Sequence, residues 1–415
     1  MIWVLVAFFN VLIAADSQDG RYTQHLLEGS LDDKASKWGF DWAFSGISSF
    51  GHLPYHRCLT GTDELFDVGI IGIPFDSAVT YRPGARLGPR AIREASARHL
   101  PSRGFNVHGG VNPYRSWARI LDCGDIPVTP LDNDVASRMM YEGLYELGNR
   151  PSANSLYGDK PKLILLGGDH SIALPALRAL KEIHNKPLAL VHFDAHLDTL
   201  HPSAYPSIWG SNQAAFNHGS MFWIASQEGI LSNSSNVHAG LRTRLTGDDW
   251  SDFENDDKQG FLRISTDDID DIGADGIIKR IYERVGGEIP VYLSIDIDVL
   301  DPAFAPGTGA PESGGWSSRE LLRIITGLRN LNIVGADIVE DRCNEMGNII
   351  FGMLIDSQPQ AFDPIRVYAR MEAQSSTFDW HDPNGQPGCS VKVAGSTHKG
   401  LLSEAAGGQG RHGGI

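Results

Sequence analysis

Three short clusters of aspartate and histidine residues carry side chains that could bind metal ions. They read Gly-Gly-Asp-His-Ser at residues 167–171, Asp-Ala-His-Leu-Asp at residues 194–198 and Asp-Ile-Asp at residues 296–298. Side chains two residues apart on an extended segment point to the same side, so Asp194, His196 and Asp198 converge, as do Asp296 and Asp298. Six residues are the candidate ligands: His170, Asp194, His196, Asp198, Asp296 and Asp298.

Four aspartates gathered in a buried place repel one another and lose their hydration, so this arrangement requires cations. Two divalent ions meet that need, and carboxylates with some imidazole suit Mn²⁺ better than thiolate-binding metals. Each cluster taken alone also fits an ordinary loop or tight turn. All three follow apolar runs, however, and this shared position favours a metal site. His192 precedes the second cluster, and we expect it to be a core histidine that points away from the ligands.

The apolar runs before the clusters are typical of strands buried on both faces of a sheet. We expect strands at residues 68–73, 162–166, 187–193, 290–297 and 333–339. Helical patterns lie between them at residues 89–97, 173–184 and 319–328. Ser317 and Glu320 form a capping box before the last helix. This alternation predicts an α/β fold, a three-layer open parallel sheet with helices on both faces. Ligands bind at the carboxyl ends of such strands, where the clusters lie.

The remaining segments differ in composition. Residues 1–15 are apolar, and a small-x-small sequence follows at residues 15–17. This pattern is typical of a signal peptide, although a buried N-terminal element is the alternative. We expect residues 16–66 to form an N-terminal arm packed on the main body and residues 67–356 a single catalytic domain. The Gly-rich residues 357–415 are expected to be a divergent, poorly ordered C-terminal tail.

The composition limits the partners that the protein can have. Of the 415 residues, 41% are apolar and 21% charged, as in a soluble globular protein. The net charge of −16 excludes a phosphate-tracking nucleic-acid binder and suits a small cationic ligand. The four cysteines allow up to two disulfides after export: Cys58, Cys123, Cys343 and Cys389. We expect a secretory or extracellular protein without membrane association once the signal peptide is removed, and an intracellular location is the alternative.

The chain resembles the ureohydrolase family, which includes arginases and agmatinases. The resemblance covers roughly residues 40–340 and rests on the motifs GGDHS, DAHxD and SxDxDxxDP, here residues 167–171, 194–198 and 294–302. Within the family, the agmatinase pattern is matched at residues 81–90, 216–219 and 302–309.

The resemblance implies an arginase-like fold with two Mn²⁺ per subunit. One ion would be held by His170, Asp194, Asp198 and Asp296, and the other by Asp194, His196, Asp296 and Asp298. It also implies that Glu340 grips the substrate guanidinium and that His218 carries a proton to the leaving amine. Asp198 would accept a hydrogen bond from the attacking hydroxide. A homo-oligomer, a trimer or hexamer, is the expected assembly.

We therefore expect a binuclear-manganese hydrolase that cleaves a guanidino group to urea and an amine. Agmatine is the favoured substrate, because Leu200 stands where the family places a polar residue that binds the α-carboxylate of arginine. Arginase or guanidinobutyrase activity is the alternative. After Glu340 the sequence departs from the family pattern at residues 341–347. An inactive metal-binding homologue is therefore a further alternative.

Overall fold

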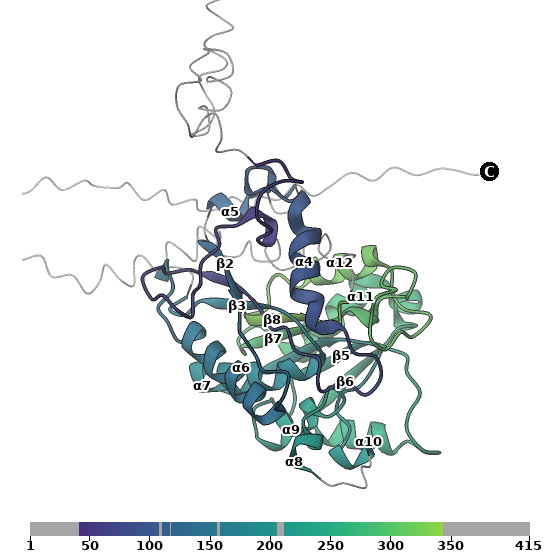
Figure 1. Ribbon diagram of the computed structural model, residues 1–415. Helices are drawn as coiled ribbons and strands as arrows, with labels where there is room; N and C mark the ends of the chain where they lie inside the picture. The colour runs from purple at the N-terminus through teal and green to yellow at the C-terminus, as the bar shows by residue number, and fades with distance from the viewer. Residues whose placement is uncertain (1–40, 108–109, 117, 156–157, 206–210, 343–415) are drawn as a thin grey trace, which may run out of the picture. The chain divides into compact units, whose positions relative to one another are not determined.

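Eight parallel strands form one sheet at the centre of the protein (Figure 1), in the order β2-β1-β3-β8-β7-β4-β5-β6. The structure, a computed structural model, describes residues 41–107, 110–116, 118–155, 158–205 and 211–342. The strands are β1 (Val68–Gly72), β2 (Ile120–Asp125), β3 (Lys162–Leu166), β4 (Ala189–Phe193), β5 (Asn236–Leu241), β6 (Phe261–Ser265), β7 (Val291–Asp296) and β8 (Ile333–Val339). The expected signal peptide and C-terminal tail lie outside the described residues.

Helices cover both faces of the sheet and so complete the three layers (Figure 1). Except in β5, the apolar side chains of a strand are divided between two hydrophobic clusters, because successive residues of a strand point to opposite faces. One cluster includes residues of α4, α11 and α12, and the other includes residues of α6, α7 and α9. The helices are α4 (Gly88–Ala95), α5 (Pro113–Ser116), α6 (Asn133–Gly148), α7 (Ala173–His184), α8 (Asn212–Ala215), α9 (Met221–Gln227), α10 (Ser251–Lys258), α11 (Asp268–Val285) and α12 (Ser318–Gly327).

The five expected strands are present, and their ends differ from the expected ones by at most a few residues. The capping box before α12 is confirmed, since Ser317 and Glu320 exchange both hydrogen bonds. The sequence patterns did not indicate β2, β5 and β6. These strands carry polar residues, such as Asp122 in β2, His238 in β5 and Arg263 in β6, whose partners lie on other elements.

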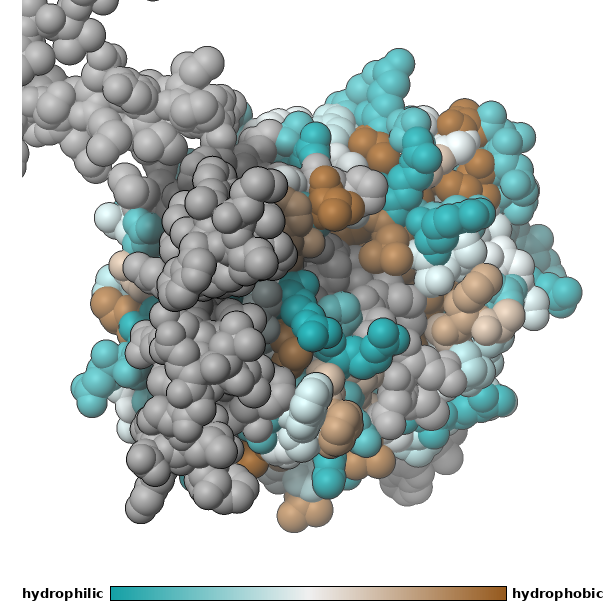
Figure 2. Space-filling model, turned by 90° about the horizontal axis from the view of Figure 1, so that it is seen from above, coloured by the Kyte–Doolittle hydropathy of each residue, from teal (hydrophilic) through white to brown (hydrophobic). Residues whose placement is uncertain are grey.

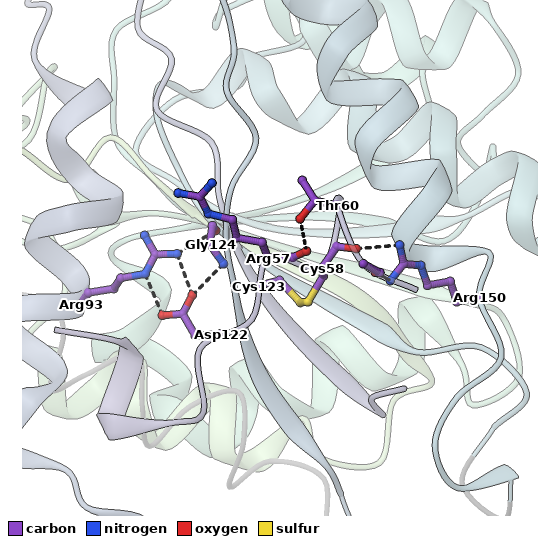
Figure 3. Close-up of a disulfide and its surroundings, with 9 residues drawn as sticks. Arg57, Cys58, Thr60, Arg93, Asp122, Cys123, Gly124 and Arg150 are labelled. Atoms are coloured by element: carbon purple, nitrogen blue, oxygen red, sulfur yellow. Dashed lines mark hydrogen bonds and ion pairs between the residues drawn. A yellow bond between two sulfur atoms is a disulfide. The ribbon is translucent and has the colours of Figure 1, made fainter. Parts of the chain in front are cut away.

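The described part of the N-terminal arm, residues 41–66, is fastened to the edge strand β2. A disulfide joins Cys58 to Cys123 (Figure 3). Beside it, the fully buried Asp122 carboxylate accepts the Phe50 backbone N–H at 2.8 Å and two donors of the Arg93 guanidinium at 2.8 and 2.9 Å. The edge of the sheet is thereby covered by the arm. The other two cysteines lie outside the described residues.

The surface carries hydrophobic side chains singly or in small groups among hydrophilic ones, on the face that Figure 2 shows. Within the described ranges, no helix combines the length and the apolar character that a membrane crossing needs.

Replacing both Cys58 and Cys123 with alanine should lower the free energy of unfolding. The bridge joins residues 65 positions apart, and the loss of that constraint on the unfolded chain costs up to about 4 kcal/mol. Urea denaturation measures this loss. Wild-type protein in reducing agent is the control and should match the variant, whereas equal midpoints of oxidised wild type and variant would show that the bridge does not form.

Candidate metal centre and its pocket

The predicted ligands meet at the carboxyl ends of three strands, β3, β7 and β4, which lie within a run of four neighbours in the sheet, β3-β8-β7-β4. His170 follows β3, and Asp194 follows β4 directly. Asp296 is the last residue of β7, and Asp298 lies in the single helical turn after it. Parallel pairing thus brings three distant parts of the chain to one edge of the sheet.

The imidazole of His170 is fully buried among three carboxylates. Its Nδ1 lies 3.1 Å from Oδ2 of Asp194, 3.1 Å from Oδ2 of Asp198 and 3.4 Å from Oδ2 of Asp296. This nitrogen has no hydrogen-bond partner within the part of the chain that the structure describes. A buried nitrogen that faces three carboxylate oxygens is an arrangement that a shared cation would complete.

Residues outside the three clusters orient the His170 ring. The Ser294 hydroxyl donates to Asp337 Oδ1 at 2.7 Å and lies 2.7 Å from His170 Nε2. The hydroxyl proton is used on Asp337, so Ser294 accepts from Nε2–H, and the lone pair of His170 stays on Nδ1. This fixed tautomer is the one that can ligate a metal, and such outer partners are typical of metal-binding histidines.

A second group of ligand atoms shares Asp194 with the first. His196 Nδ1 lies 3.2 Å from Asp194 Oδ1 and 2.9 Å from Asp298 Oδ2. Asp298 Oδ1 accepts the backbone N–H of Ala195 at 3.0 Å, which ties the second cluster to the third. Two sets of residues place ligand atoms within 4.8 Å of one another: His170, His192, Asp194 and Asp198, and Asp194, His196 and Asp298.

The electrostatics of the cluster favour bound cations. Burial raises the pKa of Asp296 well above its usual range, and the charges of Asp298 and Asp194 raise it further. Burial and the charge of Asp194 likewise raise the pKa of Asp298 to about 7. The aspartates cannot all remain ionised at neutral pH unless positive charge is added. The donor set therefore fits divalent ions, which supply that charge.

His218 and Glu340, expected to be catalytic, lie against each other beside the cluster. His218 Nδ1 is 3.0 Å from Glu340 Oε1, so the ring donates to the carboxylate from this atom. Nε2 of the ring accepts the Thr80 backbone N–H at 2.9 Å and lies 2.7 Å from the Thr80 hydroxyl. Burial lowers the pKa of His218, but the hydrogen bond and charge of Glu340 outweigh burial and raise it to about 9. Thr80 can form a hydrogen bond with Nε2 of either the neutral or the protonated ring of His218. Its amide donates to the neutral ring, and its hydroxyl can accept from the protonated ring.

Glu340 keeps one carboxylate oxygen free within the site. Oε1 accepts the His170 backbone N–H at 3.1 Å as well as the His218 proton. Oε2 is buried and has no hydrogen-bond partner among the described residues. A Cβ on Gly309 would lie 2.7 Å from Oε2, so the glycine leaves the space that this oxygen needs. The departure from the family pattern after residue 340 does not turn Glu340 away from the site.

Backbone conformation marks two of these residues. Asp198 and Glu340 have φ angles of 54° and 62°, in the left-handed region that non-glycine residues avoid. Both side chains contact His170, Asp198 at Nδ1 and Glu340 at the backbone N–H. Such strain persists where the surrounding structure enforces it and clusters at functional sites.

A pocket opens above the cluster. Asp198, Asp296, Asp298, His218 and Glu340 line its inner part. Further lining residues come from the segments after β4 and β5: Leu200, Tyr205, Arg244, Thr246 and Asp252. The buried Asp252 carboxylate accepts the Thr246 backbone N–H at 2.6 Å and its hydroxyl at 2.8 Å. Arg244 is exposed. Sequence reasoning did not single out Tyr205, Arg244, Thr246 or Asp252.

The expected direction of His192 is wrong. The residue is fully buried, as expected, but its Nε2 lies 2.9 Å from Asp194 Oδ2. The cause is the two-residue repeat of a strand, which places residues 192 and 194 on the same side. The spacing could have revealed this contact.

Comparison with known proteins places the chain among guanidino-group hydrolases and their relatives. A model of the arginase family matches residues 66–342. "Putative agmatinase 1" of Schizosaccharomyces pombe is 49% identical over 310 residues, which are 72% of this chain and 77% of that protein. The agmatinase of Chromobacterium violaceum is 37% identical over 72% of this chain and 81% of its own length. The solved proclavaminate amidino hydrolase of Streptomyces clavuligerus is 32% identical, with a TM-score of 0.66, over 77% of this chain and all of its own.

Replacing Glu340 with glutamine should lower the pKa of His218 in metal-free protein. The variant lacks the charge that raises this pKa to about 9, while burial, which lowers it, remains. NMR titration of the ring of His218 measures the change, and Glu254→Gln, on the exposed face of α10, is the control.

The His218 imidazole also makes the free energy of unfolding depend on pH. Its folded pKa is raised, so its contribution to stability is fully present below about pH 6.5 and is lost as pH rises through about 9. Glu340→Gln should flatten this dependence. A His218 pKa that stays near 9 in the variant would contradict the assigned pair.

Proposed function

The chain belongs to the arginase family, and we propose that it is a two-metal hydrolase that cleaves agmatine to putrescine and urea. The observation that carries the proposal is the buried Glu340 Oε2, which has no partner among the described residues. It lines the same pocket as the aspartates and histidines. A planar guanidinium is a matching partner for a free carboxylate oxygen, since it presents several N–H donors in a fixed geometry.

The six clustered residues would hold the ions. One ion would take His170, Asp194, Asp198 and Asp296, and the other Asp194, His196, Asp296 and Asp298. Mn²⁺ is proposed because carboxylates outnumber imidazoles and no thiolate is among the donors. When bound, two such ions lower the pKa of water and so supply hydroxide near neutral pH.

The protein groups would then orient the substrate and move a proton. Glu340 Oε2 accepts guanidinium N–H groups and holds the planar carbon over the aspartate cluster, which limits the approach of the nucleophile to one geometry. Asp198 would accept a hydrogen bond from the attacking hydroxide. His218 holds a proton at Nε2 and passes it to the amine nitrogen as the C–N bond breaks, with Thr80 Oγ1 within 2.7 Å of Nε2.

The outer part of the pocket supports a substrate with a cationic tail. Asp252 is buried there and can attract an ammonium group. Leu200 lines the same space and offers no hydrogen bond to an α-carboxylate. Both features favour agmatine over arginine. Relatives named as agmatinases are in line with this choice.

Arg244 favours a second candidate, a guanidino acid such as 4-guanidinobutyrate. Its side chain also lines the pocket, and a guanidinium pairs well with a carboxylate tail. Arg244 is exposed, so solvent screens its charge more than that of the buried Asp252. Agmatine therefore remains the proposed substrate.

A substrate panel tests the reaction and its specificity. The full chain is loaded with Mn²⁺, and urea release is measured from agmatine, arginine and 4-guanidinobutyrate. Urea from agmatine supports the proposal, and preference for 4-guanidinobutyrate favours the second candidate. Bound metal without release of urea from any of the three would identify an inactive metal-binding homologue.

We also propose that the protein is exported and forms a homo-oligomer. The Cys58–Cys123 disulfide supports export, because such bonds persist in oxidising compartments. Intact disulfide in protein recovered from the culture medium would test the first proposal. Light scattering on purified protein would test the second, for which the resemblance to ureohydrolases is the support.

Asp296→Ala should abolish activity and full metal loading. The change removes the carboxylate proposed to bridge the two ions. The loss of kcat/KM should exceed about 10³-fold, since even one lost donor to a transition state costs about 10²–10³-fold. Elemental analysis counts the bound Mn²⁺, and Asp271→Ala, on the exposed start of α11, is the matched control. An active variant with two bound ions would show that the ligand assignment is wrong.

A further inference from the structure

A chain of buried hydrogen bonds runs from the metal cluster to the far side of β5. His192 Nε2 lies 2.9 Å from Asp194 Oδ2, and His192 Nδ1 lies 2.7 Å from Nδ1 of His238. His238 Nε2 lies 3.0 Å from Asp256 Oδ1. Asp256 Oδ2 accepts from the Arg263 guanidinium at 2.7 Å. The chain connects β4, β5, α10 and β6, of which only β4 leads into a ligand cluster.

Water does not reach the inner part of this chain. His192, His238 and Asp256 are fully buried, and Asp194 is almost so. The Phe222 ring meets His192 edge-on at 4.8 Å, and the Phe261 ring stacks on His238 at 4.1 Å between centroids. Four buried polar groups that satisfy one another, between aromatic rings, hold their orientations more firmly than exposed groups would.

The donors and acceptors of the chain can be assigned from its ends. An ionised carboxylate can only accept a hydrogen bond. His192 therefore donates from Nε2 to Asp194, and His238 donates from Nε2 to Asp256. The contact between the two Nδ1 atoms needs one more proton, so one ring carries two.

Asp256 also reaches the second ligand cluster by another route. Its Oδ1 accepts from the Thr199 hydroxyl at 2.8 Å, and Thr199 follows Asp198 directly. One carboxylate on α10 thus supports both ends of the 194–198 cluster. Asp256 is linked to Asp194 through the imidazoles of His238 and His192. It is linked to Asp198 through the neighbouring Thr199.

We propose that His192 is a positioning residue that fixes the carboxylate of Asp194 for metal binding and is itself held by His238 and Asp256. The inference rests on the proposed function, because it assigns Asp194 to the metal centre. The Nε2–H of His192 holds Oδ2 of Asp194 in place before an ion binds. Metal binding then costs less side-chain entropy, because the carboxylate is already oriented.

Direct ligation by His192 is the competing assignment, since its Nε2 lies among the ligand atoms of the first group. His192 Nε2 meets only one carboxylate of the described cluster, that of Asp194, and its other ring nitrogen is engaged by His238. His170 differs, because its Nδ1 faces three carboxylates and has no hydrogen-bond partner among the described residues. The structure therefore assigns ligation to His170 and support to His192.

Paired substitutions in the full chain test the proposal. His192→Gln keeps an N–H donor at the position of Nε2, and His192→Leu removes it. Likewise, His238→Asn keeps a polar group at the position of Nδ1, and His238→Leu does not. His184→Leu, in the last turn of α7, is the control. Calorimetry measures the Kd and number of Mn²⁺ ions, and circular dichroism shows whether each metal-free variant is folded.

We expect His192→Leu to raise the Kd of at least one Mn²⁺ by about 10–100-fold, which is the usual cost of a lost outer partner. His192→Gln should restore most of the affinity. His238→Leu should weaken binding more than His238→Asn, and this pair decides the test if His192→Leu does not fold. Excess Mn²⁺ should restore urea release in every folded variant, because the ligands themselves are intact.

Two results would overturn this inference and leave the proposed function standing. In one, wild type binds two ions and His192→Leu binds both as tightly. In the other, His192→Gln loses one ion completely, which would make His192 a ligand. If wild type binds no Mn²⁺, the proposed metal centre fails, and the inference fails with it.

Discussion

Repulsion among buried aspartates is the constraint on which the arrangement of this site depends. Asp194, Asp198, Asp296 and Asp298 face one small volume, and each of them is buried or nearly so. Their mutual charge raises the pKa of Asp296 and Asp298 after burial has already done so. A fold that gathers these groups must provide either protons or metal ions to balance them. His170 is oriented by its hydrogen bond to Ser294, and the cluster carboxylates accept from His192 and from the backbone N–H groups of Ala195 and His196. These contacts direct the side chains for binding of metal ions.

The two sides of the pocket divide the chemistry between them. The aspartate cluster occupies the ends of β4 and β7, whereas Glu340 and His218 lie on the side of β8 and β3. Glu340 Oε1 is used within the protein, and this leaves Oε2 as the one oxygen with which the residue can meet a substrate. Because the same carboxylate also raises the pKa of His218, the proposed binding of a cationic substrate and the proposed proton transfer would be coupled through a single side chain.

Sequence patterns predicted the central part of this architecture and missed its periphery for a physical reason. β3, β4, β7 and β8 are buried on both faces, so they are nearly all apolar, with at most one or two polar residues each, and each leads to a residue of the site. β2, β5 and β6 include Asp122, His238 and Arg263, whose polar groups are satisfied by residues distant in sequence. Local patterns carry no information on such partners. The contact of His192 with Asp194 was accessible from spacing alone, whereas the continuation to His238 and Asp256 required the tertiary structure.

The parallel pairing of β3 with β8 has a consequence for how the protein is made. Leu163 pairs with Gly335, so these two neighbouring strands are 335 − 163 = 172 residues apart in the chain. Pairings of such long range form slowly, because the chain must lose the entropy of closing a large loop before the new contacts stabilise it. A ribosome must therefore release most of the polypeptide before β8 can insert between β3 and β7. The complete pocket, which needs Glu340 at the end of β8, would then form late in maturation.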